Sequence, residues 1–242
     1  MRRVLTRLLA VLFSISICSA VWAGPFSISP VRIQMSPKDK AVAVTITNEG
    51  DDALVMQADV YTWSQKPDGE DDLKLTEDIF LSPPIIKLAG KARQVVRLAR
   101  LSSAQPTDQL TYRLIVREIP EAKPNSGNLQ LQIAIAFSLP VFITPPKATA
   151  KLDCSVERKA ADMLVASCEN TGNAYAQIID LTVADNSGKT LGSRDQGGYI
   201  LPAIKRNFEI KSTGASYGGG KAILSVRLDD GKAKSFEINL NN

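Results

Sequence analysis

Residues 128–146 read NLQLQIAIAFSLPVFITPP and form the longest strand-like run in the sequence. Large apolar residues alternate with glutamine and alanine in its first half, and side chains two positions apart share one face of a strand. Two prolines end the run, because proline cannot donate a hydrogen bond to a strand ladder. The segment therefore predicts a long β-strand followed by a domain boundary. Its apolar row consists of Leu129, Leu131, Ile133 and Ile135.

Similar strand-like runs, separated by polar turns, occupy the sequence on both sides of this segment. No long segment shows the 3.6-residue apolar period of a helix. We predict an all-β protein of two β-sandwich domains, residues 24–146 and 147–242, joined by a short proline-containing linker. The predicted strands are residues 41–47, 53–63, 94–98, 112–119, 129–142, 151–156, 163–169, 176–185, 208–210, 222–228 and 235–240.

The first 23 residues have the three parts of a secretory signal peptide. Three arginines form a basic front, an apolar run follows, and Val21 and Ala23 are the small residues of a cleavage site. The apolar run is shorter than the ~20 residues of a membrane-spanning helix. We therefore expect export and cleavage after Ala23. The alternatives are an uncleaved membrane anchor and a lipoprotein acylated at Cys18.

Composition narrows the functions that the chain can have. Histidine is absent from the 242 residues, which excludes Ser-His-Asp catalysis, Cys-His catalysis and HExxH zinc chemistry. Without residues 1–23 the basic side chains fall from 29 to 26 against 25 acidic ones, so the net charge falls from +4 to +1. A general basic surface for nucleic acid is therefore not expected.

Two short motifs could suggest a bound ligand, and both lack the necessary spacing. Asp229-Asp230-Gly231 lacks the ligand spacing of an EF-hand calcium loop. The glycine-rich residues 216–220 lack the Lys-Ser/Thr ending of a P-loop and lie between predicted strands. We expect neither a metal nor a cofactor.

Two cysteines remain after the predicted cleavage, Cys154 and Cys168. An even count in an exported chain indicates a disulfide, and the spacing fits two strands of a hairpin. A redox-active pair would more often be Cys-x-x-Cys. We therefore expect a structural disulfide, to which loop-closure entropy assigns about 3 kcal/mol of stabilisation.

The alternating row at residues 129–135 has two interpretations. The ordinary one is a half-buried strand whose apolar face packs into its own domain. The other is an edge strand whose apolar row packs into a groove of a second protein. A strand edge has free N–H and C=O groups with which an added chain can pair. Periodicity alone does not separate the two interpretations.

Segments along nearly all of the mature chain, in the same order, match the landmarks of one known family. They are SPVRI at residues 29–33, VTITN at 44–48, SPPIIKL at 82–88, YRLIVREIP at 112–120, LQIAIAFSLPVFITP at 131–145 and SYGG at 216–219. Together, and behind a signal peptide, they resemble the PapD-like periplasmic pilus-assembly chaperones of the chaperone–usher pathway.

The resemblance implies a fold, a function and partners. The fold is two immunoglobulin-like β-sandwich domains. The function is donor-strand complementation: the chaperone inserts one of its strands into the open groove of a pilus subunit and then delivers the subunit to an outer-membrane usher. An enzyme activity, a cofactor, a nucleic acid or a small-molecule substrate is not implied. Self-association is a further way for the free chaperone to cover its apolar strand.

The resemblance also assigns roles to residues. The row at 129–135 becomes the donor strand, and Arg32 becomes the anchor for the subunit's C-terminal carboxylate. A guanidinium suits this role because it can hold a carboxylate with two charge-assisted hydrogen bonds. Family members commonly carry a second anchor, a lysine, where this sequence has Pro140. Arg113 and Arg117 are the candidates to replace it.

Two further positions differ from the common family pattern. Thr144 and Ser216 stand where an interdomain ion pair is often found, which predicts domains held together mainly by packing. The ending Leu139-Pro140-Val141-Phe142 is more like the archaic, or sigma-class, branch, to which we assign the sequence.

Two other function classes compete with the chaperone interpretation. An exported structural protein, either a pilus subunit or an adhesin, would also be a β-sandwich. Its donor segment would lie near the mature N-terminus, where Phe26, Ile28, Pro30 and Arg32 form a poor apolar row. An exported glycosidase would need two carboxylates across a cleft, whereas the acidic pairs at 51–52 and 71–72 lie in predicted turns.

Overall fold

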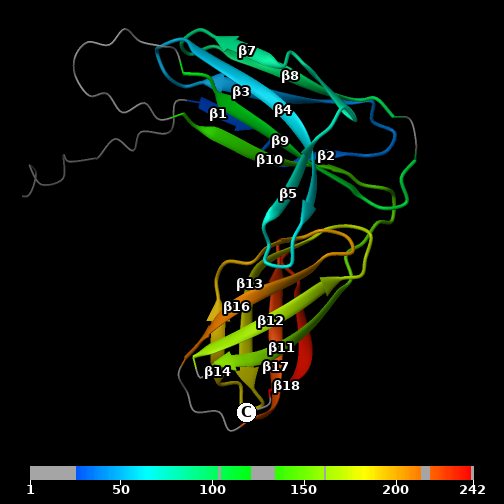
Figure 1. Ribbon diagram of the computed structural model, residues 1–242, viewed down its shortest axis with the longest axis vertical. Coiled ribbons are helices and arrows are strands. Elements are labelled where there is room, and N and C mark those ends of the chain that lie inside the picture. Colours follow the sequence, from blue (N-terminus) through cyan, green and yellow to red (C-terminus); the bar gives the residue numbers. More distant parts are fainter. Residues whose placement is uncertain (1–25, 103–104, 121–133, 161, 214–218, 241–242) are drawn as a thin grey trace, which may run out of the picture.

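The computed structural model describes residues 26–102, 105–120, 134–160, 162–213 and 219–240. Every regular element among these residues is a β-strand. The strands form two units, which lie one above the other in Figure 1. Strands β1–β10 make the N-terminal unit and β11–β18 make the C-terminal unit. The prediction of an all-β fold is confirmed.

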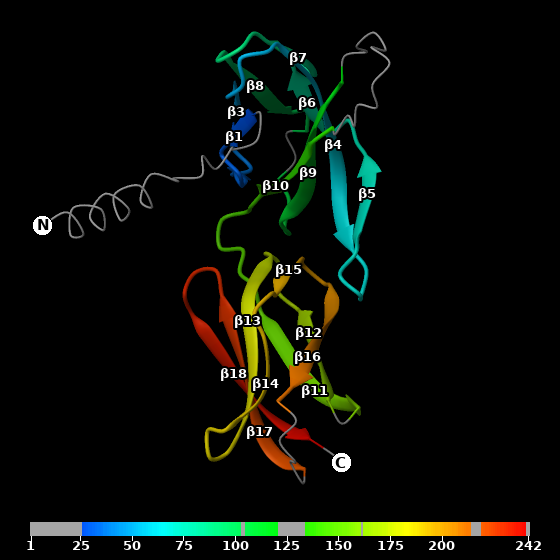
Figure 2. The same ribbon diagram turned by 90° about the vertical axis from the view of Figure 1, so that its left-hand side faces the viewer.

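The N-terminal unit is a sandwich of two sheets (Figure 2). One sheet is four-stranded, with the order β1-β3-β8-β6, and the other is six-stranded, with the order β2-β10-β9-β4-β5 and β7 also paired with β4. The inward rows of both sheets pack into one apolar core. The strands are β1 Phe26–Ser29, β2 Ile33–Met35, β3 Ala41–Asn48, β4 Leu54–Gln65, β5 Asp71–Leu75, β6 Ile79–Ser82, β7 Ile85–Leu88, β8 Arg93–Arg100, β9 Leu110–Glu118 and β10 Ala136–Ile143.

The C-terminal unit is one eight-stranded sheet, with the order β11-β12-β16-β14-β13-β17-β18 and β15 also paired with β13. The edge strands β11 and β18 contact each other, so the sheet folds over on itself around a second apolar core. The strands are β11 Leu152–Ala160, β12 Met163–Asn170, β13 Ala176–Asp185, β14 Thr190–Arg194, β15 Gly198–Ile200, β16 Lys205–Ser212, β17 Gly220–Leu228 and β18 Ala233–Leu240.

The predicted disulfide is present in the C-terminal unit. Cys154 on β11 and Cys168 on β12 lie directly opposite each other and are bonded with an S–S distance of 2.06 Å. Both cysteines are buried in the core of this unit. The bond therefore ties together two neighbouring strands, as the hairpin spacing predicts.

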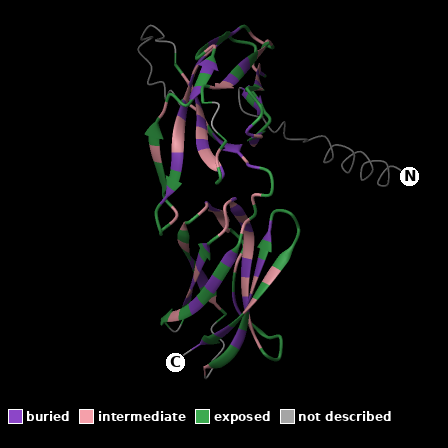
Figure 3. Ribbon diagram, turned by 90° about the vertical axis from the view of Figure 1, so that its right-hand side faces the viewer, coloured by how far each residue is buried: buried purple, intermediate pink, exposed green. Residues whose placement is uncertain are grey.

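Most strands alternate between buried and exposed residues, which Figure 3 shows as stripes along the ribbons. The strands with a long alternation, such as β4 and β13, are among those that the sequence predicts. Seven short strands were not among the predicted ones, namely β1, β2, β5, β6, β7, β14 and β15. Strand β5 reads DDLKL and has no buried residue, so it carries no periodic signal. Its position depends on pairing with β4.

The chain changes sheets immediately before Arg32. Strand β1 pairs antiparallel with β3 in the first sheet, whereas β2 pairs parallel with β10 in the second. Pro30 lies at the crossing, where its missing N–H prevents the first ladder from continuing. This crossing places Arg32 at the end of the six-stranded sheet that faces the C-terminal unit.

Candidate functional site

An aromatic cluster fills the junction between the two units. Trp63 and Phe142 of the N-terminal unit pack with Leu201 of the C-terminal unit, and all three are buried. Tyr175 and Tyr199 join them from the C-terminal unit. The ring centroids of Phe142 and Tyr175 are 4.2 Å apart, and those of Trp63 and Tyr199 are 5.3 Å apart. Rotation of one unit against the other would expose these rings to water, so the cluster holds the units together.

Buried amide side chains add directional contacts across the junction. The Oε1 atom of Gln109 accepts a hydrogen bond from the Tyr175 N–H at 2.8 Å, and its Nε2 donates to Thr144 Oγ1 at 2.7 Å. The Oε1 atom of Gln65 accepts a hydrogen bond from the Leu201 N–H at 3.1 Å. Both glutamines are buried. Leaving such a group without its partner is costly, so these bonds favour one relative orientation of the units.

The β4–β5 hairpin extends from the N-terminal unit onto the C-terminal unit (Figure 1). The N–H of Asn207 donates to the carbonyl of Pro67 at its tip, at 2.9 Å. Gly69 of the same tip has a φ of +92°, and a Cβ atom there would lie 2.3 Å from Arg206 Nε. The positive φ favours glycine at this position, and any larger residue would also displace the end of the Arg206 side chain.

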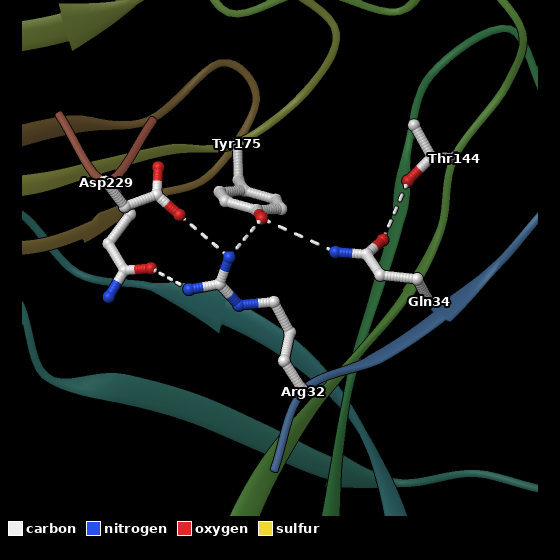
Figure 4. Close-up of polar contacts among 6 residues, drawn as sticks. Arg32, Gln34, Thr144, Tyr175 and Asp229 are labelled. Atoms are coloured by element: carbon white, nitrogen blue, oxygen red, sulfur yellow. Dashed lines mark hydrogen bonds and ion pairs between the residues drawn. The ribbon is translucent and has the colours of Figure 1, made fainter. Parts of the chain in front are cut away.

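Arg32 extends from the N-terminal unit to three side chains of the C-terminal unit (Figure 4). Its Nη1 donates to Asp229 Oδ2 at 2.7 Å and to the Tyr175 hydroxyl at 3.0 Å, and its Nη2 donates to Gln177 Oε1. Burial by itself lowers the pKa of the guanidinium, but the hydrogen bond with Asp229 raises it, with a net upward shift. Arg32 is therefore charged and already bound to a carboxylate.

This ion pair adds to the packing that the sequence predicts as the main link between the domains. An ion pair does cross the junction, but it is formed by Arg32 and Asp229. Thr144 instead shares hydrogen bonds with Gln109 and Gln34. Ser216 lies outside the described residues.

The strand register brings Arg32 and Arg113 to opposite sides of Pro140. Strands β2 and β10 are parallel and pair Ile33 with Val141, and Arg32 directly precedes β2, so extending this register by one position puts Arg32 opposite Pro140. On the other side, β9 pairs Arg113 with Pro140. Neighbouring strands lie about 4.8 Å apart, so the two arginines are about two strand spacings apart in one row. Their guanidinium carbons lie 5.8 Å and 5.9 Å from the centroid of the same ring, Tyr199.

Arg113 is held more tightly than Arg32. Its guanidinium carbon lies 3.6 Å from the ring centroid of Trp63, and its Nη2 donates to Asp71 Oδ2 at 3.0 Å. Its side chain is 13% exposed, against 34% for Arg32. Burial lowers the pKa of Arg113, and Asp71 opposes this effect. The buried Nε has no hydrogen-bond partner among the described residues.

Arg117 lies farther from the junction, on the same strand as Arg113. It pairs in register with Ala136 at the start of β10. Its Nη2 forms an ion pair with Asp59 at 3.1 Å and donates to the Tyr61 hydroxyl at 3.1 Å. Of the two candidates for a second anchor, only Arg113 shares the row of Arg32.

The apolar row at 129–135 is described only at its C-terminal end. Ile135 is half-buried and packs with Phe137 against the N-terminal core, and Phe137 contacts Phe26 with ring centroids 4.8 Å apart. Ala134 and Ala136, on the opposite face, are exposed. The remaining residues of the row, Leu129, Leu131 and Ile133, lie outside the described residues.

Strand β10 has one fully paired edge and one edge that is half open. Strand β9 pairs with β10 along its full length, from Ala136 to Ile143, whereas β2 pairs with β10 only over Val141–Ile143. Among the described strands, none pairs with the second edge between Ala136 and Pro140. Free backbone groups on such an edge can pair with an additional strand.

A family model described as pili and flagellar-assembly chaperone, PapD N-terminal domain, matches residues 25–149. The match covers just over half of the chain and includes Arg32 and β10. The chain belongs to this chaperone family. The resemblance seen in the sequence segments is therefore confirmed.

Curated relatives are also chaperones. Chaperone protein AfaB of Escherichia coli is 21% identical over 193 residues, which cover 74% of this chain and 73% of AfaB. Chaperone protein PmfD of Proteus mirabilis is 27% identical over 138 residues, which cover 55% of this chain and 50% of PmfD.

Solved structures show that both units of this chaperone have the family fold. A chain of the CsuC–CsuE complex, a chaperone with a tip subunit of the archaic Csu pili of Acinetobacter baumannii, matches with a TM-score of 0.66 and 22% identity. The match covers 90% of this chain and 99% of that one. The Escherichia coli chaperone DraB matches with a TM-score of 0.56 and 21% identity, over 89% and 96% of the two chains.

The site of the chaperone contains residues that the sequence did not reveal. Tyr175, Gln177 and Asp229 surround Arg32, and Asp229 is 197 positions away from it in the chain. In the sequence, Asp229 is notable only as part of a weak calcium motif. A local signal for its pairing with Arg32 does not exist, because the contact depends on how the two units dock.

Two negative findings apply to the described part of this chaperone. No group of three or more Cys, Asp or Glu side chains there is arranged to hold a metal ion. The same residues contain no helix with the length and apolar character needed to cross a membrane.

Proposed function

We propose that this chaperone binds pilus subunits by donor-strand complementation in the periplasm and delivers them to an outer-membrane usher. The observation that carries the proposal is the open edge of β10 beside the half-buried Ile135 and Phe137. An open edge supplies backbone hydrogen bonds to an added strand, and an alternating row supplies side chains for its pockets. Complexes of other family members support this partner class: CsuC with the tip subunit CsuE, and SafB with the pilin SafA of Salmonella enterica.

In this proposal the donor row replaces a strand that the subunit lacks. A subunit without its last strand exposes an apolar groove and unpaired backbone groups, which favour aggregation. Full burial of each large apolar side chain contributes about 1.5–3 kcal/mol. The four side chains thus supply several kcal/mol after the cost of ordering the strand is subtracted. The row consists of Leu129, Leu131, Ile133 and Ile135.

Arg32 and Arg113 are the proposed pair of anchors for the C-terminal carboxylate of the subunit. They flank Pro140 in one row, so a carboxylate above Pro140 lies within reach of both guanidinium groups. Arginine can bind a carboxylate with two parallel N–H···O bonds, which fixes the register of the inserted strand. Arg113 therefore takes the role that a lysine at position 140 has in other family members, whereas Arg117 is too far along β9.

The proposal includes export, domain limits and a branch of the family. The signal peptide is removed after Ala23, and the domains comprise residues 24–146 and 147–242. The end of β10 at Ile143 and the start of β11 at Leu152 support the boundary. The archaic, or sigma-class, branch is supported by the similarity to the CsuC–CsuE complex of archaic Csu pili. The chaperone is not an enzyme, and its action requires no cofactor.

The first test is co-purification from periplasmic extract. The tagged chaperone is expressed with the neighbouring open reading frames, and the proteins that bind to it are identified. We expect a stoichiometric partner of about 15–20 kDa, the size of one incomplete sandwich domain. Recovery of the chaperone alone, or of a fibre built from it, would contradict the proposal.

A matched pair of variants tests the donor row. Ile135→Asp places a charge in the half-buried apolar row, whereas Ala134→Asp places the same charge on the exposed face. We expect Ile135→Asp to lower subunit recovery at least tenfold and Ala134→Asp to leave it nearly unchanged. Thermal unfolding of each free variant shows whether the chaperone itself still folds. Ile133→Asp provides a second substitution in the same row.

The competing interpretation, a structural pilus subunit, lacks a suitable donor segment. Phe26 and Ile28 are buried in the protein's own core and belong to β1, which pairs with β3. They are therefore already used within the N-terminal unit. Purification of assembled fibres that contain this chain would nevertheless favour the structural role.

A further inference from the structure

In the chain without a subunit, the proposed anchor Arg32 already holds a carboxylate. Asp229 Oδ2 accepts a hydrogen bond from Arg32 Nη1 at 2.7 Å, and the two side chains form an ion pair across the junction (Figure 4). Asp229 belongs to the turn that follows β17. An internal carboxylate thus lies at the guanidinium that the proposed function assigns to a subunit.

The Arg32–Asp229 pair changes what an incoming carboxylate meets. A free guanidinium attracts a carboxylate by its full charge, but a guanidinium paired with Asp229 is neutralised. A second carboxylate near this pair would also be repelled by the first, because both would lie within a few ångströms of one cation. Strong binding therefore requires Asp229 to move away from Arg32.

We propose that Asp229 occupies Arg32 in the free chaperone and competes with the terminal carboxylate of a subunit for it. This inference rests on the proposed role of Arg32 as the carboxylate anchor. Asp229 then acts as a specificity-determining residue. Isolated carboxylates bind Arg32 more weakly because of this competition, and a carboxylate that is delivered with a pairing strand displaces Asp229.

The geometry allows Asp229 to leave while Arg32 keeps its position. The side chains of Arg32 and Asp229 are 34% and 25% exposed, so water can reach the pair. The Tyr175 hydroxyl and Gln177 Oε1 accept hydrogen bonds from the same guanidinium. These neutral groups orient Arg32 without adding a competing charge.

The Arg113–Asp71 ion pair differs from the Arg32–Asp229 pair in how firmly its carboxylate is held. Asp71 accepts hydrogen bonds from both Arg113 Nη2 at 3.0 Å and Trp63 Nε1 at 2.7 Å. Arg113 is also stacked on Trp63 and is 13% exposed. Asp71 is therefore fixed by two partners within its own unit, whereas Asp229 comes from the other unit. Of the two, Asp229 is the carboxylate that can exchange.

Proximity explains how Asp229 can exclude weak competitors and still yield to a subunit. An intramolecular partner acts at a high effective concentration, so a carboxylate alone competes poorly with it. A subunit adds the burial of its groove and the pairing of its strand to the same binding event. When the donor strand is later replaced, Asp229 can bind Arg32 again and favour release.

The test measures carboxylate binding to the mature free chaperone and its Asp229→Asn variant. The probe is acetate, with acetamide as its uncharged counterpart, and the readout is the NMR signal of the Arg32 Nε–H, assigned by its loss in Arg32→Ala. An exposed ion pair has a modest strength, so we expect acetate to bind about two- to fivefold more tightly to Asp229→Asn. Acetamide should cause no comparable shift in either protein.

Asp180→Asn is the matched control. Asp180 forms an ion pair with Arg227, and its side chain is 22% exposed, close to the 25% of Asp229. Both acids lie in the C-terminal unit, but Asp180 does not contact Arg32. Asp180→Asn should bind acetate as the unmodified chaperone does.

The outcomes separate this inference from the proposed anchor. Unchanged or weaker acetate binding at Arg32 in Asp229→Asn overturns the competition, while Arg32 can still be the anchor. Equal tightening in Asp180→Asn also overturns it, because the effect would then be one of general charge. An Arg32 Nε–H signal that does not respond to acetate in either protein shows that Arg32 does not bind a carboxylate, which overturns the anchor itself.

Discussion

The two units of this chaperone end in strands with different surroundings. The last strand of the N-terminal unit, β10, has an edge that is open over Ala136–Pro140 and a half-buried row beside it. The last strand of the C-terminal unit, β18, pairs with β17 and also contacts β11, which closes the unit. The N-terminal unit can therefore accept another strand, whereas the C-terminal unit provides a closed support that carries Asp229.

The largest expected effect is a loss of unfolding free energy in the closed C-terminal core, which should exceed the loss at the half-buried row of β10. Phe208 is 1% exposed in the C-terminal core, and its replacement by alanine should cost about 3–5 kcal/mol of unfolding free energy. Phe137 is only half-buried, so Phe137→Ala should cost clearly less, about 1–2 kcal/mol. Urea unfolding measures both. Equal losses would show that the row at Phe137 is as closed as the core.

The disulfide should contribute nearly as much to the unfolding free energy, and only to that of the C-terminal unit. The double variant Cys154→Ala, Cys168→Ala should lose about 3 kcal/mol of stability, because the unfolded chain regains the freedom of the released loop. Binding of subunits at moderate temperature should persist, since the bond lies outside the N-terminal unit. Reduction of the unmodified chaperone provides the control. A direct loss of subunit affinity in a still-folded variant would contradict this division of roles.

Alkaline pH should destabilise the N-terminal unit through Tyr112. Burial, together with the nearby Asp78 carboxylate, raises the pKa of Tyr112 to about 12, against an ordinary value of about 10. The unfolded state therefore loses this proton first, and stability falls as the pH rises from about 10 to 12, by about 2–3 kcal/mol. Tyr112→Phe should flatten the pH dependence of urea unfolding in this range. An unchanged slope would contradict the assignment to Tyr112.

The smallest expected effect concerns the hairpin that joins the units. Gly69 and Gly231 both have positive φ angles, of +92° and +80°, but only Gly69 lies against another side chain, that of Arg206. Gly231→Ala should cost about 1 kcal/mol for its backbone conformation alone. Gly69→Ala should cost more, since it also displaces the Arg206 side chain. Equal losses in thermal unfolding would mean that the hairpin contact adds nothing to the stability.

Sequence reasoning succeeded where the signal was local. The long strands β3, β4, β9 and β13 were predicted because their alternation extends over many residues. The disulfide was predicted because two cysteines remained in an exported chain, at a hairpin spacing. The short strand β5 was missed, because it has no buried residue and is held in place by β4.

For the candidate site, the sequence and its family resemblance singled out Arg32, but not its surroundings. The choice between Arg113 and Arg117 as second anchor stayed open in the sequence. Two strand registers favour Arg113, namely the parallel one of β2 with β10 and the antiparallel one of β10 with β9. Together they put Arg113 and Arg32 on opposite sides of Pro140. Register of this kind depends on strand pairing between distant segments, which side-chain periodicity does not encode.

The sequence by itself determined the all-β class, the apolar row, the disulfide and the family, because alternation, cysteine spacing and ordered segments are properties of the chain. Only the tertiary structure decided that Arg32 is bound to Asp229, and that Arg32 and Arg113 share one row. The Arg32–Asp229 contact follows from the docking of the two units around Trp63, Phe142 and Leu201, whereas the shared row follows from strand register within the N-terminal unit. Docking buries an aromatic cluster and so brings together charges that the chain keeps far apart.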